Sequence, residues 1–224
     1  ENRFMVIFFG ETEKRRKWKV HKGKIKFKYE VLPGILFQKK GLAPHFFNPT
    51  IFTKLIKYSP EILVIGGYQH GSSLLALLYA KLFKRRAILW CESNKYDLRL
   101  NYPLKEAYKR WFIRNCDGYI VPGKASFEYL LSLGAAAKKI WVAPNAVDND
   151  YFNQAASRHR ETKEIFKQSK GYPHKLILYV GRLIEHKGIL DLLKAFQFLS
   201  YKQSGLGLLL IGSGEGEGRY RNFC

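Results

Sequence analysis

The sequence predicts an α/β protein built on parallel sheets, and three observations favour this class. Short apolar runs without polar alternation recur along the chain, which is typical of strands buried on both faces of a parallel sheet. Each run is followed by a loop and then by apolar residues at three- and four-residue steps, the pattern of a helix packed by one face. The repeated order of strand, loop and helix implies a parallel sheet with helices on both faces.

The first part of the chain contains most of these units, and glycine or proline marks many of their limits. We expect strands over residues 3–9, 61–67, 87–90, 117–121 and 139–143. We expect helices between Pro49 and Tyr58, over 73–85, around 104–112 and up to Leu133. Gly134 is placed to end the last of these helices.

A basic segment follows the first strand, from Lys14 to Lys28. One face of its second half carries Ile25, Phe27, Tyr29 and Val31. This alternation predicts a half-exposed strand near a sheet edge, where lysines also discourage edge-to-edge pairing. Two interpretations stay open: the lysines form a solvated edge, or they dock on an anionic membrane with Trp18 at the interface.

The charge of the whole chain points to an anionic partner. Lysine and arginine total 39 against 18 aspartates and glutamates, which gives a formal net charge of +21. Nucleic acid, anionic lipid and a phosphorylated substrate all fit such a charge, and charge alone does not choose among them.

The three cysteines, Cys91, Cys116 and Cys224, have neither metal-ligand spacing nor an even count. No apolar run approaches the ~18 residues that span a bilayer, and the start lacks a signal-peptide pattern. We therefore expect a cytoplasmic protein, with peripheral association at the cytoplasmic membrane face as the alternative.

The stretch from residue 175 to 198 combines a strand, a polar loop and an amphipathic helix. The loop holds Gly181, Arg182, Lys187 and Gly188. It follows the carboxyl end of a strand, where open α/β sheets bind ligands, and the next helix N-terminus presents free N–H groups. Two cations at that position favour a diphosphate ligand, although an ordinary βα turn with solvated basic residues is the alternative.

These loop residues resemble the family 4 glycosyltransferases, whose second domain opens with a strand, Gly-Arg, a few variable positions, Lys-Gly and a helix. The resemblance implies a GT-B fold, with an N-terminal Rossmann-like sheet and the beginning of a second Rossmann-like domain. It also implies that Gly181, Arg182, Lys187 and Gly188 bind the diphosphate of a nucleotide-sugar donor.

A second landmark is Pro144-Asn145-Ala146-Val147-Asp148 with Phe152, where the family usually has Pro-Asn-Gly-Val-Asp and a nearby Phe. Ala146 in place of glycine predicts negative φ, or strain, in this loop. In the family the motif marks the passage between domains, so Asn145 is an interdomain-loop candidate. The implied domains are an acceptor-side domain (1–150) lacking its first strand, a helical linker (151–173) and the start of a donor domain (174–224).

The glycine-rich segment after the strand at 207–211 offers two further candidates, Gly212 and Gly214. A flexible loop explains them, but the family usually has Gly-x-Gly here, close to the donor. On the acceptor side His70 and Glu92 each follow a predicted strand and are candidate catalytic residues, with ordinary loop residues as the alternative. Many family members have a histidine where this chain has Cys91-Glu92-Ser93.

The resemblance implies transfer of a sugar from a nucleotide-diphosphate-sugar donor to a glycan or lipid-linked acceptor, with retention at the anomeric carbon. We expect no cofactor and no metal, because Arg182, Lys187 and the helix N-terminus can stabilise the departing diphosphate.

No pair of glutamates at the family's Glu-x7-Glu spacing follows Gly218, so we expect a truncated and inactive fragment. The alternative is a basic protein that binds nucleic acid or another polyanion without catalysis. No nucleic-acid module is visible in the sequence, so specific nucleic-acid binding is not expected.

Overall fold

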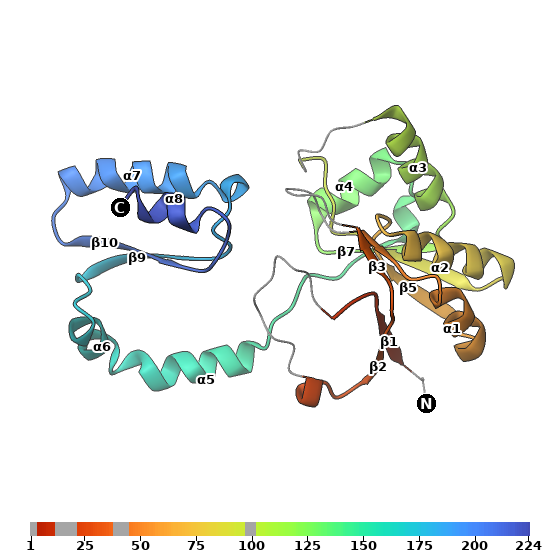
Figure 1. Cartoon of the computed structure of the whole chain (residues 1–224), viewed down its shortest axis with the longest axis horizontal. Helices are drawn as coiled ribbons and strands as arrows, with labels where there is room; N and C mark the ends of the chain where they lie inside the picture. The colour runs from red at the N-terminus through yellow and green to blue at the C-terminus, as the bar shows by residue number, and fades with distance from the viewer. Residues whose placement is uncertain (1–3, 12–21, 38–44, 97–101) are drawn as a thin grey trace. The chain divides into compact units, whose positions relative to one another are not determined.

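The computed structural model describes residues 4–11, 22–37, 45–96 and 102–224 (Figure 1). The chain divides into two compact units, Glu1–Ala146 and Val147–Cys224, which we call unit 1 and unit 2.

Unit 1 is built on a four-stranded parallel sheet in the order β5-β6-β7-β8. The strands are β5 (Ile62–Gly66), β6 (Arg86–Trp90), β7 (Gly118–Val121) and β8 (Ile140–Val142). Gly66 lies opposite Trp90, and Trp90 opposite Ile120, so the carboxyl ends of β5, β6 and β7 meet at one edge. The strands predicted from residue 61 onward are confirmed to within a few residues.

Four helices share one hydrophobic core with this sheet. They are α1 (Ile51–Tyr58), α2 (Gly71–Leu82), α3 (Pro103–Arg114) and α4 (Lys124–Ser132). Leu77 of α2 and Phe112 of α3 are fully buried with Leu89 and Val121 of the sheet. Past the end of α4, Gly134 has φ +98°, a left-handed conformation, as the sequence predicts for the residue that ends it.

Within the described residues the second face of this sheet is open, which corrects the prediction of helices on both faces. Its side chains include Val64 on β5 and Trp141 on β8, which are 55% and 56% exposed. The strand order explains why. Each new strand is added on the same side of the previous one, so right-handed crossovers bring α2, α3 and α4 to the same face. Helices on the other face require the strand order to reverse.

Unit 1 also contains two small sheets. Strand β1 (Met5–Phe8) pairs in parallel with β2 (Lys28–Val31), and β3 (Ile35–Phe37) pairs antiparallel with β4 (His45–Phe47). A short 3₁₀ turn, η1, spans Lys22–Lys24. The expected strands are present but shorter, and β1 is half-buried rather than buried. The β3–β4 pair was not predicted.

A buried amide joins these small sheets to the main core. Asn48 is fully buried, and its Nδ2 donates hydrogen bonds to the carbonyls of Phe9, Leu32 and Pro33 at 3.0–3.2 Å. Its Oδ1 accepts a hydrogen bond from the Ser72 hydroxyl at 2.9 Å. One side chain therefore fixes the ends of β1 and β2 to the start of α2.

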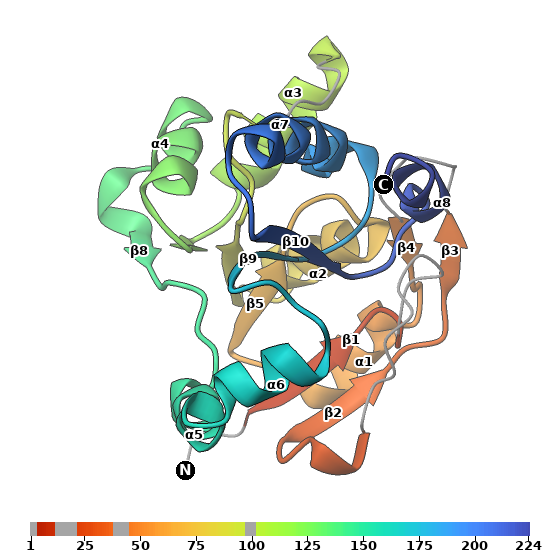
Figure 2. The same cartoon turned by 90° about the vertical axis from the view of Figure 1, so that its left-hand side faces the viewer.

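Unit 2 has a two-stranded parallel sheet covered by a helix. Its elements are α5 (Asn149–Arg160), α6 (Lys163–Ser169), β9 (Lys175–Val180), η3 (Glu185–Lys187), α7 (Ile189–Lys202), β10 (Leu206–Ile211) and α8 (Glu217–Arg221). Figure 2 shows α7 lying along one face of the β9–β10 pair. Tyr179, Leu208 and Leu210 pack on that side against Ile189 and Leu193.

The expectation that β9 is buried on both faces is wrong, because one face of the β9–β10 pair is exposed. Leu178 and Val180 are 57% and 68% exposed. They lie on the face away from α7, because side chains alternate along a strand and Tyr179 points to the helix. In the described part of the chain β9 pairs with β10 alone.

The helices of the predicted linker, α5 and α6, belong to unit 2. The roles assigned to the domains stay predictions. Among the described residues, no helix combines the length and apolar character that crossing a bilayer requires.

Candidate functional site

The loop after β9 continues the pairing of the two strands beyond their ends. The Gly181 N–H donates to the Ile211 carbonyl at 2.9 Å, and the Leu183 N–H donates to the Ser213 carbonyl at 3.0 Å. The Gly216 N–H then donates back to the Leu183 carbonyl at 2.9 Å. We call this paired stretch, residues 181–183 and 211–216, the loop junction. It fixes the predicted diphosphate loop against the predicted donor loop.

Gly212 and Gly214 permit the close backbone approach in the loop junction. A Cβ added at Gly212 would lie 1.7 Å from the Gly181 carbonyl oxygen, and one at Gly214 would lie 2.2 Å from the Leu183 carbonyl oxygen. Gly212 also has φ +159°, which side-chain-bearing residues rarely adopt. Packing explains both glycines, and their contact with a donor stays a prediction.

Gly188 marks the start of α7. It has φ +67°, in the left-handed region, and the Leu192 N–H donates to its carbonyl at 3.0 Å. The next three N–H groups, at residues 189–191, have no acceptor within the helix. Together with the helix dipole they make this end attractive to an anion.

The two predicted donor cations lie in the loop that leads from β9 to this helix. Arg182 is half-buried, and its carbonyl accepts a hydrogen bond from the Tyr179 hydroxyl at 3.1 Å; Lys187 is exposed. Within the described ranges neither cation forms an ion pair, whereas neighbouring Glu185 pairs with Arg219 at 3.6 Å. The structure thus brings Gly181, Arg182, Lys187 and Gly188 into one loop, as expected, with both cations available to a ligand.

The interdomain motif lies at the end of unit 1. Asn145 is exposed, and Ala146 is not among the residues with positive φ, which fits the conformation expected for alanine there. The motif continues into an Asp148-Asn149-Asp150 triplet, which the expectation of no metal overlooked. Asp148 caps α5 by accepting a hydrogen bond from the Tyr151 N–H at 2.9 Å. No cluster of three metal-binding side chains occurs among the described residues.

His70 lies at the carboxyl edge of the main sheet, immediately before α2. Its Nδ1 accepts a hydrogen bond from the Phe46 N–H at 3.2 Å, which places the proton of a neutral ring on Nε2. The rings of Phe9, His45 and Phe46 surround it at centroid distances of 5.8, 6.2 and 5.6 Å. These contacts give His70 a structural role, and a role with the acceptor stays a prediction.

Glu92 follows the adjacent strand, β6, and is exposed. Its carbonyl accepts a hydrogen bond from the Ser126 hydroxyl at 3.4 Å. The preceding Cys91 is buried in the core. Since β5 and β6 are neighbours, His70 and Glu92 come from the same edge of the sheet.

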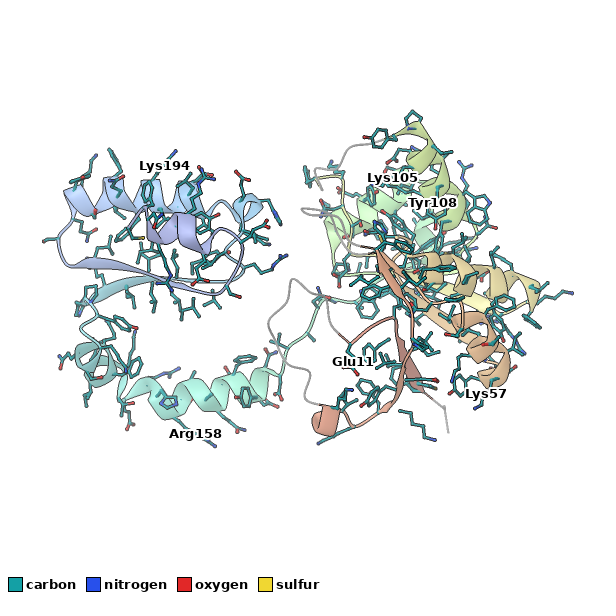
Figure 3. The ribbon with its side chains drawn as sticks, viewed as in Figure 1. Glu11, Lys57, Lys105, Tyr108, Arg158 and Lys194 are labelled. Atoms are coloured by element: carbon teal, nitrogen blue, oxygen red, sulfur yellow. The ribbon has the colours of Figure 1, made fainter. Side chains whose placement is uncertain are left out.

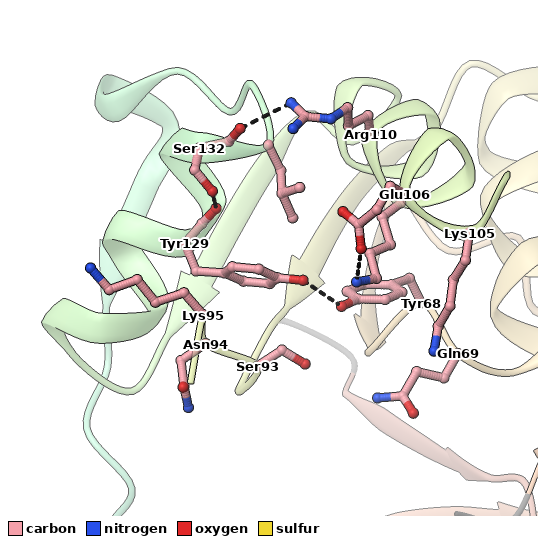
Figure 4. Close-up of a pocket in the computed structure, with 12 residues that line it drawn as sticks. Tyr68, Gln69, Ser93, Asn94, Lys95, Lys105, Glu106, Arg110, Tyr129 and Ser132 are labelled. Atoms are coloured by element: carbon pink, nitrogen blue, oxygen red, sulfur yellow. Dashed lines mark hydrogen bonds and ion pairs between the residues drawn. The ribbon is translucent and has the colours of Figure 1, made fainter. Parts of the chain in front are cut away.

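A pocket that the sequence analysis missed lies beside this edge, between α3 and α4 (Figure 4). Its volume is about 190 Å³. Its lining is mostly polar and comes from four segments: Tyr68, Gln69, Ser93, Asn94, Lys95, Lys105, Glu106, Lys109, Arg110, Tyr129, Ser132 and Leu133. Two of these segments directly follow β5 and β6, the strands that precede His70 and Glu92. Their position after the two strands was the one sign of the pocket in the sequence.

Hydrogen bonds and ion pairs order this lining. The Tyr68 and Tyr129 hydroxyls lie 3.3 Å apart, Lys109 forms an ion pair with Glu106, and Arg110 donates to the Ser132 carbonyl at 3.0 Å. Burial, and then the hydrogen bond with Tyr129, raise the pKa of Tyr68 above its ordinary value. The Tyr68 hydroxyl therefore stays protonated at neutral pH.

The remaining positive charge is spread over the molecule. Figure 3 shows Lys57, Arg158 and Lys194 projecting from α1, α5 and α7, and all three are exposed. Much of the predicted membrane-docking surface, residues 12–21 with Trp18, lies outside the described residues.

Comparison with known proteins decides among the predicted classes. The family model described as Glycosyltransferase Family 4 matches residues 12–151, which is more than half of the chain. The chain belongs to glycosyltransferase family 4. A second model, Glycosyl transferases group 1, matches residues 160–224. The predicted family is confirmed, and it disfavours a polyanion-binding protein as the alternative.

Individual relatives agree with this membership. An uncharacterized glycosyltransferase of Methanocaldococcus jannaschii, MJ1059, is 24% identical over 81% of this family 4 chain and 48% of its own length. The 2-deoxystreptamine glucosyltransferase of Streptomyces kanamyceticus is 30% identical over 52% of this chain and 30% of its own. The chain spans about half the length of the relatives it matches most fully, at 48% and 56%.

Solved structures confirm the GT-B fold of this family 4 chain. Anabaena HepE in complex with UDP superposes with a TM-score of 0.60 at 14% identity, covering 88% of this chain and 50% of that one. A glycosyltransferase from Rickettsia africae gives a TM-score of 0.55 at 17% identity, covering 88% and 49%.

Proposed function

We propose that the protein containing this chain transfers a sugar from a nucleotide-diphosphate-sugar donor to a glycan or lipid-linked acceptor. The observation that carries the proposal is the loop junction with the start of α7. There Arg182, Lys187 and the free N–H groups at residues 189–191 lie in one loop and its helix. Three sources of positive charge at one strand end suit a diphosphate.

The chemistry of the donor explains the use of these groups. When the sugar leaves, the nucleoside diphosphate departs with a developing negative charge. Arg182, Lys187 and the α7 N-terminus would stabilise that charge as it forms. We therefore propose a metal-independent reaction, and the family resemblance supports retention at the anomeric carbon.

Uridine diphosphate is the appropriate probe for this site. Anabaena HepE was solved with UDP and with UDP-glucose, at TM-scores of 0.60 and 0.56 to this chain. Titration calorimetry of the chain with UDP tests the proposal. We expect Arg182→Gln and Lys187→Gln each to weaken UDP binding about tenfold, the loss of one charge-assisted contact of about 1.4 kcal/mol.

The matched control is Lys194→Gln on the exposed face of α7, which removes the same charge outside the loop. It should leave UDP affinity unchanged. Equal weakening by Lys187→Gln and Lys194→Gln would mean that UDP follows the net charge of the protein, and the donor site would be rejected.

Two further proposals concern activity and location. We propose that residues 1–224 alone transfer no sugar, so that turnover above a heat-killed control would contradict this. We also propose that Lys14 to Lys28 holds the protein at an anionic cytoplasmic membrane face. Vesicles rich in anionic lipid should then retain the chain at low salt and release it at high salt.

A further inference from the structure

The pocket between α3 and α4 has a positive lining with one uncommitted cation. Four cationic side chains face it against a single carboxylate, Glu106. Lys109 forms an ion pair with Glu106, and Arg110 donates a hydrogen bond to the Ser132 carbonyl. Lys95 lies over the Tyr96 ring, 5.2 Å from its centroid. Within the part of the chain that the structure describes, Lys105 forms no ion pair, hydrogen bond or ring contact. Lys105 is therefore free to pair with an anion from solution.

The position of Lys105 adds to its suitability. It is the third residue of α3, which begins at Pro103, so it lies in the first helical turn, at the end of the helix that carries a partial positive charge. Figure 4 shows Lys105 extending toward Gln69, on the α3 side of the tyrosine pair, while Lys95 lies on the α4 side.

The neutral part of the lining suits hydroxyl groups. The Tyr68 and Tyr129 hydroxyls lie 3.3 Å apart, and the Ser93 hydroxyl belongs to the same lining. Because a hydroxyl both donates and accepts, this cluster can exchange hydrogen bonds with the hydroxyls of a polyol. Asn94 and Gln69 add amide groups at the rim.

The size of the pocket limits its ligand. Its volume of about 190 Å³ lies below the roughly 300–1,000 Å³ typical of pockets for drug-sized ligands. One sugar-sized group suits this volume better than a whole nucleotide sugar does.

We propose that this pocket binds the phosphate ester of a sugar or other polyol, with Lys105 on the phosphate and Tyr68, Tyr129 and Ser93 on the hydroxyls. The proposal rests on the proposed function, because it assigns this chemical class to the acceptor. The phosphate supplies a negative charge that can pair with Lys105. The polyol supplies hydroxyl groups that can form hydrogen bonds with the tyrosine and serine hydroxyls.

Direct binding to the chain of residues 1–224 tests the pocket without any turnover. Titration with glucose 6-phosphate and with glucose should show at least tenfold tighter binding of the phosphate ester. Lys105→Gln should abolish most of that preference, and Tyr68→Phe should weaken both sugars about two- to fivefold. Lys138→Gln, an exposed lysine in the turn before β8, is the matched control and should change nothing.

The same proteins separate this site from the donor site. Lys105→Gln should leave UDP binding intact, and Lys187→Gln should leave glucose 6-phosphate binding intact. If the unmutated chain bound glucose 6-phosphate but not UDP, the donor site would be rejected and this pocket would not. Equal affinity for glucose and its phosphate, or equal losses in Lys105→Gln and Lys138→Gln, would overturn the pocket proposal.

A second titration identifies the source of the ester. Vesicles containing phosphatidylinositol present the same chemistry on a lipid, and vesicles of phosphatidylglycerol supply charge without the ring. Retention on phosphatidylinositol vesicles that depends on Lys105 would assign the pocket to a lipid headgroup. Binding of glucose 6-phosphate alone would assign it to a free sugar phosphate. If glucose 6-phosphate and both kinds of vesicle bound equally well to the unmutated chain and to Lys105→Gln, the site would be rejected.

Discussion

Strands β6 and β9 have similar sequences and very different surroundings. Both are short apolar runs that end at a candidate binding loop. In β6, Leu89 is fully buried, because β5 and β7 flank the strand and helices cover that face. In β9, Leu178 is 57% exposed, because β10 is its one partner among the described residues and α7 covers the opposite face. An apolar run therefore identifies a strand, whereas the layers around it decide its burial.

Replacing one leucine in each strand by alanine should reveal the largest difference in stability between β6 and β9. Leu89→Ala should lower the free energy of unfolding of unit 1 by about 2–5 kcal/mol, since it removes buried surface and leaves a cavity. Leu178→Ala should cost less than about 0.5 kcal/mol, because solvent already reaches that side chain.

Urea unfolding measures the first effect. All four tryptophans lie within residues 1–146, so their fluorescence reports unit 1. Hydrogen exchange of the β9 and β10 amides measures the second effect. If Leu178→Ala proved as costly as Leu89→Ala, the open face of β9 would have to be covered in solution.

The loop junction in unit 2 should be the next most sensitive feature. In Gly212→Ala the new methyl group would meet the Gly181 carbonyl, so the two loops must separate and lose the hydrogen bonds at Gly181 and Leu183. At about 1 kcal/mol for each bond we expect a loss of about 2–3 kcal/mol. Faster exchange of the Gly181 and Leu183 amides would report it.

The control for this change is Gly218→Ala. A Cβ at Gly218 meets nothing within 4 Å, and the residue lies within α8, where alanine is favoured over glycine. Exchange at the loop junction should be unchanged there. Similar acceleration in both variants would show that the loops are not held by close backbone contact.

Much of the local structure was predictable from the sequence. Strand β5 lies within the expected range because an apolar run is bounded by Pro60 and Gly67, and Gly134 ends its helix by a left-handed conformation. The direction in which the sheet winds was not predictable, since the same alternation of strands and helices fits one or two covered faces. The β3–β4 pair was not predictable, because each strand has only three residues and shows too little of an alternating pattern.

The candidate site, like the fold, was only partly predictable from the sequence. Sequence located the loop of Arg182 and Lys187, because its residues are contiguous with a strand and a helix. The reason for Gly212 and Gly214 could not be seen, because it depends on two loops far apart in sequence pairing backbone to backbone. The pocket between α3 and α4 was missed because its lining comes from four separate segments.

The smallest expected effect concerns pH and again follows from burial in unit 1. Burial raises the pKa of the Cys116 thiol to about 12 from an ordinary 9.0; nearby Lys81 lowers it and Asp117 raises it. Below pH 9 the thiol is protonated in both the folded and the unfolded chain. Above pH 9 the unfolded chain releases this proton and the folded chain keeps it, so stability falls as pH rises toward 12.

The expected loss between pH 9 and 10 is about 1 kcal/mol, within the limit of about 1.4 kcal/mol per pH unit for one group. Tryptophan fluorescence during urea unfolding at about pH 8, 9 and 10, under reducing conditions, measures it. Cys116→Ala should remove this part of the loss and leave the part that comes from buried Tyr119, whose pKa burial also raises. Cys224→Ala, at an exposed thiol, should leave the dependence unchanged. If wild type and Cys116→Ala lost stability equally over this range, ionisation of other groups would have to account for the loss, and the burial of Cys116 would not.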